Sequence, residues 1–164
     1  MNMKLQRGLT MLELVIVIAV LVVLGALAVP SLSMRLDQQR LGSAAEALVA
    51  DVNEARFEAA RQGHTMHVVM REGEGWCWAV ATVAQCPCGQ RQACELRSAT
   101  PRDHAGVQLV RAASVQLLPT GRAESASSAM LESRRGARLR VDVQLLGRTQ
   151  ICSPGGAAGR YPAC

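Results

Sequence analysis

The residues best suited to chemistry in this sequence are its six cysteines, which are Cys77, Cys86, Cys88, Cys94, Cys152 and Cys164. An even number of cysteines after an export-type N-terminus favours disulfides formed in an oxidising compartment. Cys152 and Cys164 are the natural pair to close the C-terminal tail, and the pairing of the other four stays open. A zinc site at those four is the alternative, but they lack paired CxxC spacing. We therefore expect disulfides and no metal.

Other side chains with catalytic potential form no recognisable arrangement. His64 and His67 lie where a helix is expected to end and a strand to begin, and His104 is isolated, so structural roles are favoured. The sequence has many serines but no Gly-x-Ser-x-Gly motif and no Ser/His/Asp arrangement. No glycine-rich loop leads from a strand into a helix to hold a nucleotide. We expect a protein that is not an enzyme and that needs no cofactor.

The N-terminus combines a basic start, an acid and a long apolar stretch. Lys4 and Arg7 precede Glu13, and residues 14–30 contain no charged side chain. An acid near a membrane helix costs up to about 3 kcal/mol at the bilayer centre and less near an interface. One interpretation is a signal peptide cleaved after Ala28, and a second is a plain membrane anchor. A third interpretation must explain both the acid and the sequence beyond the apolar stretch.

The segment after Pro30 is predicted to be helical. Apolar residues recur at three- and four-residue steps, which places them on one face of a helix; they are Leu41, Ala45, Leu48, Val52, Ala55 and Ala59. Gly63 is a plausible stop signal. The apolar helix thus continues into an amphipathic helix that ends near Gln62, with a bend at Pro30 because proline removes a backbone donor. A cleaved signal peptide would give no reason for this continuity.

From residue 65 the pattern changes to strands. We expect strands at residues 66–71, 76–84, 107–110, 114–118, 138–145 and 148–152, with loops at residues 85–94 and 124–136. The clearest strand is residues 138–145, because Leu139, Val141, Val143 and Leu145 alternate with polar side chains. Trp76 and Trp78 lie on one face of a strand and are expected in the core. The predicted fold class is α+β, with a long bent N-terminal helix against an antiparallel β-sheet head.

Charge is unevenly distributed along the chain. The net charge is +5, yet residues 31–60 hold five acids and three arginines, whereas residues 105–164 hold eight arginines and three acids. A basic C-terminal half fits either an anionic partner or an ordinary solvated surface.

Two segments carry a resemblance to a known family. Residues 8–13 read Gly-Leu-Thr-Met-Leu-Glu, which resembles the processing motif of type IV prepilins and type II secretion pseudopilins. Residues 147–154 read Gly-Arg-Thr-Gln-Ile-Cys-Ser-Pro, which resembles the last hairpin of the FimT/GspH family of minor pilins and pseudopilins. Residues 115–122 are similar to the strand and turn that precede this hairpin in the family.

The resemblance implies a maturation route and a location. An integral-membrane prepilin peptidase would cut between Gly8 and Leu9, and the new N-terminus of Leu9, where the family usually has Phe, would be methylated. Glu13 would then pair with the N-terminal ammonium of a neighbouring subunit. The implied segments are a leader (1–8), a transmembrane and filament-core helix (9–30), an amphipathic helix (31–63) and a head with disulfides (64–164). The protein would cross the inner membrane once, with its head in the periplasm, and join a pilus or pseudopilus.

The resemblance also implies an alternative function. Some FimT-like minor pilins bind DNA during natural transformation through a Gly-Arg-x-Arg motif on the last hairpin. This chain has Gly147 and Arg148, but Gln150 stands at the second arginine position. Arg138, Arg140 and Arg148 could share one polar face of the hairpin. Arg134, Arg135 and Arg160 would lie nearby, and such a cluster would contact phosphates without reading sequence.

Overall fold

The computed structural model describes residues 11–90, 92–156 and 160–164. For residues 26–31 it describes the backbone alone. Within the described residues, helix α1 (Met11–Gln62) is followed by eight strands in two sheets. Contacts divide the chain into two units, Met1–Leu36 and Asp37–Cys164. The strands of the described residues all lie in the second unit, together with the end of α1.

The first sheet has the strand order β3-β2-β1-β5. Its strands are β1 (Met66–Arg71), β2 (Cys77–Ala81), β3 (Glu95–Ala99) and β5 (Val115–Leu117). All neighbouring strands in it are antiparallel, and β1 and β2 form the hairpin that the sequence predicts. The expected second strand is shorter than residues 76–84, because the chain turns away at residue 82 into the loop that carries Cys86, Cys88 and Cys94.

The second sheet has the order β4-β6-β7-β8. Its strands are β4 (Val107–Ala112), β6 (Ser127–Ser133), β7 (Arg138–Val143) and β8 (Thr149–Cys152), again antiparallel. The prediction of a loop at residues 124–136 is wrong, because β6 is a central strand of this sheet. Its sequence SSAMLES has weak β propensity, but the strand pairs with β4 on one side and β7 on the other, and its alternate side chains are buried.

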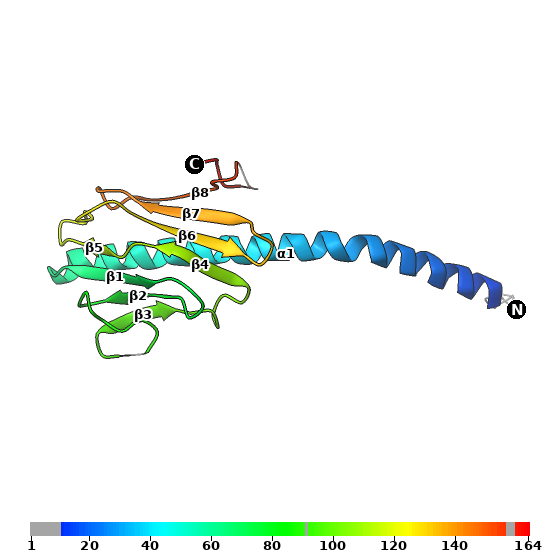
Figure 1. Ribbon diagram of the computed structural model, residues 1–164, viewed down its shortest axis with the longest axis horizontal. Helices are drawn as coiled ribbons and strands as arrows, with labels where there is room; N and C mark the ends of the chain where they lie inside the picture. Colours follow the sequence, from blue (N-terminus) through cyan, green and yellow to red (C-terminus); the bar gives the residue numbers. More distant parts are fainter. Residues whose placement is uncertain (1–10, 91, 157–159) are drawn as a thin grey trace, which may run out of the picture. The chain divides into compact units, whose positions relative to one another are not determined.

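Both sheets pack against the same stretch of α1, which runs behind them in Figure 1. The six helix positions predicted from their spacing are all buried: Leu41, Ala45, Leu48, Val52, Ala55 and Ala59. They join Trp76, Trp78, Leu109 and Leu131 in one core. The helix ends at Gln62, as expected, and Gly63 (φ +69°) caps it by donating its N–H to the Ala59 carbonyl at 3.0 Å.

In the last hairpin, the predicted alternation holds for three of four residues. Leu139, Val141 and Val143 are buried, whereas Leu145 is exposed because β7 ends before it. The backbone of α1 is helical through Pro30, and the predicted bend there stays a prediction.

Candidate processing and interaction sites

The predicted processing site lies at the start of α1. Gly8 and Leu9 fall outside the described residues, whereas Glu13 lies in the first turn of the helix and is exposed. From Met11 to Leu24 the large apolar side chains of α1 are also exposed. Within the described residues, α1 contains no stretch that is both long and apolar enough to cross a membrane.

The arginines proposed for DNA binding are placed on the second sheet and the C-terminal tail, and most of them are paired. Arg138 Nε lies 2.8 Å from a carboxylate oxygen of Glu132, and Arg140 Nε lies 3.0 Å from Asp142. Arg160 pairs with Glu46 of α1. Among the described residues, Arg148 has no such partner. The structure therefore does not gather these four side chains into one open cationic face.

Gly147 has a structural task at the turn between β7 and β8. Its φ is +73°, in the left-handed region that favours glycine. A Cβ on this residue would collide with the Gly121 carbonyl oxygen and lie 2.9 Å from Arg56 Cδ. The Gly147 carbonyl accepts a hydrogen bond from Arg56 Nη1 at 3.0 Å. The glycine of the family-like Gly-Arg pair thus lets this turn lie against α1 and the turn at Gly121.

The C-terminal tail is closed by the predicted disulfide Cys152–Cys164. The tail folds back beside β8, and the Tyr161 hydroxyl donates a hydrogen bond to Glu46 at 2.9 Å. Gly42 lies beneath this ring, since a Cβ there would be 2.8 Å from the hydroxyl oxygen. Burial is the main reason that the pKa of Tyr161 is raised. The tail is therefore part of the folded unit.

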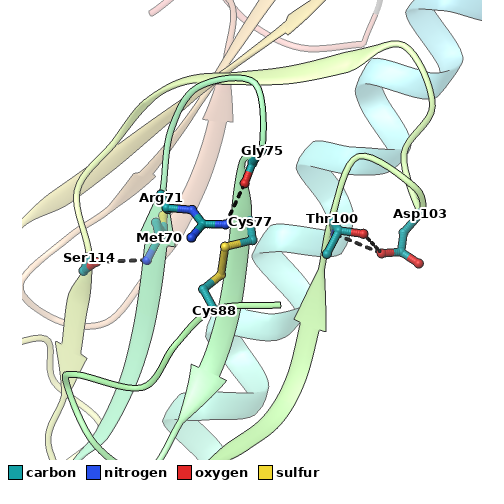
Figure 2. Close-up of a disulfide and its surroundings, with 8 residues drawn as sticks. All are labelled: Met70, Arg71, Gly75, Cys77, Cys88, Thr100, Asp103 and Ser114. Atoms are coloured by element: carbon teal, nitrogen blue, oxygen red, sulfur yellow. Dashed lines mark hydrogen bonds between the residues drawn. A yellow bond between two sulfur atoms is a disulfide. The ribbon is translucent and has the colours of Figure 1, made fainter. Parts of the chain in front are cut away.

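The other four cysteines form two disulfides, Cys77–Cys88 and Cys86–Cys94, in place of the alternative zinc site. The first of these joins Cys88 to the face of β2 that carries Cys77 and Ala79, opposite the core (Figure 2). Cys77, Ala79 and Cys88 form a small separate cluster there. The described residues contain no group of three His, Cys, Asp or Glu side chains suited to a metal ion.

Sequence reasoning missed a buried polar group on α1. Asp51 accepts a hydrogen bond of 2.7 Å from the Trp78 indole nitrogen, and Arg97 Nε lies 3.5 Å from its other oxygen. His104 stacks on Trp78 with ring centroids 5.4 Å apart, and burial lowers the pKa of His104. Asp51 lies three residues after Leu48 and four before Ala55, so its position on the buried face was the available signal.

Comparison with known proteins identifies the fold and the family. A sequence model described as "Type II transport protein GspH" matches residues 44–147, more than half of the chain. The chain belongs to the GspH family. It is therefore a minor pilin or pseudopilin of the GspH/FimT type, as the sequence resemblance predicts. This family consists of structural subunits of membrane-associated filaments, which implies contacts with other pilin-like subunits.

The type IV minor pilin FimU of Pseudomonas aeruginosa has a similar structure, with a TM-score of 0.55 and 18% identity. The match covers 74% of this chain and 98% of FimU, and a second FimU crystal form gives the same TM-score. The minor pseudopilin EpsH of Vibrio cholerae also matches, with a TM-score of 0.49, 15% identity, and coverage of 71% and 98%. No curated protein sequence matches this chain.

Proposed function

We propose that this chain is matured by a prepilin peptidase and then built into a type IV pilus or a type II secretion pseudopilus. The peptidase cuts between Gly8 and Leu9, and the new amino group is methylated. Residues 9–30 anchor the chain in the inner membrane, with one bend at Pro30, and later enter the filament core. Residues 31–63 form the amphipathic part of the helix, and the head (64–164) lies in the periplasm.

The observation that supports this proposal most is the exposed apolar surface of α1 from Met11 to Leu24, with Glu13 as its one acid. So much exposed apolar surface is stable only when lipid or neighbouring helices cover it. A carboxylate in that environment needs a cation. Cleavage after Gly8 creates an ammonium group at Leu9 that a neighbouring subunit can bring to Glu13.

Replacing Glu13 with glutamine tests the pairing. Glu13→Gln removes the charge but keeps the size of the side chain, so we expect normal membrane insertion and a folded head but loss of the subunit from sheared filaments. Glu74→Gln, which changes an exposed acid in the turn between β1 and β2, is the matched control. Normal filament incorporation of Glu13→Gln would refute the proposed pairing.

The DNA-uptake alternative has weaker support from the geometry. Three of its four arginines, Arg138, Arg140 and Arg160, are neutralised by carboxylates within the chain. Phosphate binding would have to rest mainly on Arg148, and a single cation supplies little of the affinity that DNA-binding proteins show.

A further inference from the structure

The two disulfides at the cysteine-rich loop cross each other along the chain. Cys77 is bridged to Cys88. Cys86 lies between these two residues in the sequence, yet it is bridged to Cys94, which lies beyond them. We call this arrangement the crossed pairing. Four cysteines can be joined in three ways, and the alternative in chain order, which we call the consecutive pairing, joins Cys77 to Cys86 and Cys88 to Cys94.

The unfolded chain has little basis for choosing the crossed pairing. Cys86 and Cys88 are separated by Pro87 alone, so both lie at nearly the same chain distance from Cys77. The entropy cost of closing a flexible loop grows only with the logarithm of its length. Cys77 therefore meets either partner about equally often before the fold forms.

The folded sheet selects the crossed pairing by geometry. β2 presents Cys77 on its face opposite the core, where Cys88 and Ala79 form one buried cluster with it (Figure 2). The Cα atoms of the first pair are 6.0 Å apart, and those of Cys86 and Cys94 are 5.9 Å apart. Both distances suit a disulfide. The information that specifies the pairing thus lies in the sheet and not in the local sequence.

This sheet is completed only by residues that follow the cysteines. β2 pairs with β1 and β3, and the other neighbour of β1 is β5 (Val115–Leu117). At a synthesis rate of about 5–20 residues per second, β5 follows Cys94 by about a second or more, and disulfides form within seconds in the presence of an oxidant. The cysteines can therefore pair before the sheet exists.

The chain cannot correct a wrong pairing by itself. Disulfide exchange begins when a thiolate attacks a bridge, and all six cysteines are used in bridges, so a fully oxidised chain has no thiolate of its own. In the folded protein Cys77, Cys86 and Cys88 are at most 5% exposed. The attacking thiolate must therefore come from another molecule and must act before the loop is packed.

We propose that residues 77–94 are the substrate of a periplasmic disulfide isomerase, a protein with an exposed reactive thiolate. This inference rests on the proposed function for the oxidising compartment. The isomerase thiolate attacks Cys86 Sγ in a Cys77–Cys86 bridge, which forms a mixed disulfide and releases the Cys77 thiolate. That thiolate attacks Cys88 Sγ in the Cys88–Cys94 bridge and releases the Cys94 thiolate.

The last exchange returns the isomerase to its starting state. The Cys94 thiolate attacks Cys86 Sγ in the mixed disulfide, which forms the Cys86–Cys94 bridge and releases the isomerase thiolate. Two disulfides are broken and two are formed, so no oxidant or reductant is consumed.

Peptide mapping of the full-length chain tests this proposal. The chain is isolated from its host and from a strain that lacks the periplasmic disulfide isomerase, with free thiols blocked at lysis. Trypsin gives the peptides 72–91 and 92–97, which a disulfide to Cys94 holds together in both pairings. Breaking the backbone before Pro87 in the mass spectrometer splits the linked pair only in the consecutive pairing. In the crossed pairing the Cys77–Cys88 bridge spans the break.

We expect the crossed pairing in nearly all chains from the host. Without the isomerase it should fall about threefold, to roughly the one third expected when three pairings form at random. Cys152–Cys164 is an internal control, because these two cysteines are consecutive and their bridge should form equally in both strains. Equal amounts of the crossed pairing in the two strains would overturn the proposal, and so would the consecutive pairing in the host.

A double variant provides the matched control. Replacing Cys86 and Cys94 with serine leaves Cys77 and Cys88 as consecutive cysteines, so their bridge should form in equal yield with and without the isomerase. If the isomerase deletion lowers this bridge as much as it lowers the crossed pairing of the unmodified chain, then the isomerase does not act by resolving the crossed bridges and the proposal fails.

The same samples separate this proposal from the proposed function. If the mature chain begins at Leu9 and is found in filaments, but the crossed pairing forms equally in both strains, then only the isomerase proposal fails. If the cysteines are found as free thiols, then the head does not reach an oxidising compartment, and the proposed periplasmic location fails together with the isomerase proposal.

Discussion

Replacing Gly147 with alanine should destabilise the unit Asp37–Cys164 strongly, although it adds one methyl group. The residue has φ +73°, and the new Cβ would meet the Gly121 carbonyl oxygen and Arg56 Cδ. The backbone oxygen belongs to another turn of the fold and cannot move aside as a flexible side chain can. The substitution therefore combines backbone strain with overpacking.

The magnitude is the sum of three contributions. A non-glycine residue in the left-handed region costs about 1–2 kcal/mol. Overpacking at a rigid contact typically costs about 1–3 kcal/mol. Displacing the hydrogen bond from Arg56 to Gly147 adds about 0.5–1.5 kcal/mol. We expect Gly147→Ala to lower the free energy of unfolding by about 2.5–6.5 kcal/mol, a large part of the roughly 5–15 kcal/mol typical of a domain.

Gly136 provides the matched control. It lies in the turn between β6 and β7 with φ +81°, and the nearest atom to an added Cβ is a Glu132 carboxylate oxygen at 4.0 Å. Gly136→Ala should therefore cost only the backbone contribution of about 1–2 kcal/mol. The difference between the two variants isolates the collision at Gly147.

Urea unfolding followed by tryptophan fluorescence measures both variants. Trp76 and Trp78 are buried, so their emission should change when the core opens. If Gly147→Ala lowers the free energy of unfolding no more than Gly136→Ala does, then the turn between β7 and β8 is not held against Gly121 and α1. That result would refute the structural role assigned to Gly147.

Further predictions concern the buried acid, the tail, pH and DNA. Asp51→Ala should lower the free energy of unfolding in urea by about 1–3 kcal/mol, because it leaves the buried Trp78 indole N–H without an acceptor. Asp51→Asn keeps an acceptor and should lower it less. Equal losses for the two variants would contradict this role of Asp51. Replacing both Cys152 and Cys164 with serine should cost roughly 2–3 kcal/mol and speed hydrogen exchange in residues 160–164; unchanged exchange would show that the tail is held without the disulfide. Because burial lowers the pKa of His104, the unfolded chain takes up the proton first, so stability is full above about pH 6.5 and falls as the pH drops below it. His104→Gln should flatten this acid-side decline, and an unchanged slope between about pH 7.5 and 5.5 would refute the assignment. In an electrophoretic shift assay with DNA, Arg148→Gln should leave the mobility of the DNA in the presence of the protein nearly the same as with the unmodified chain. If the unmodified chain gives a salt-dependent shift and Arg148→Gln abolishes it, the DNA alternative is favoured instead.

Periodicity made the helix and its buried face predictable. The three- and four-residue spacing from Leu41 to Ala59 matches the buried face of α1, and Gly63 marks its end. The alternation in residues 139–143 likewise predicted β7. These elements were predictable because each buries one regular face, so a single sequence carries the pattern.

The missed strands depend on long-range contacts. The β6 residues Ser127, Ser128 and Ser133 have little preference for strands, and the segment is extended because β4 and β7 pair with it on both sides. The strand β3, which follows the cysteine-rich loop, was not predicted for the same reason, since its extended conformation depends on pairing with β2. Neither pairing leaves a local signal.

In the candidate sites, too, the features with a local signal could be predicted and those that depend on long-range contacts could not. The Cys152–Cys164 pair could be predicted from its position at the tail, but the other two pairings required the geometry of the loop. The ion pairs of the arginines could not be predicted from sequence, because they form only when the strands and the helix have assembled. Glu46 is the clearest example, since it lies on α1 and pairs with Arg160 of the C-terminal tail.

The most direct test of the proposed function is the mass of the mature N-terminal peptide from protein isolated from filaments or from the inner membrane of its host. We predict a peptide that begins at Leu9 and carries one methyl group on its amino terminus. A peptide that begins at Val29 would identify an ordinary signal peptide and would contradict the filament proposal, because Glu13 and the apolar helix would then be absent from the mature protein.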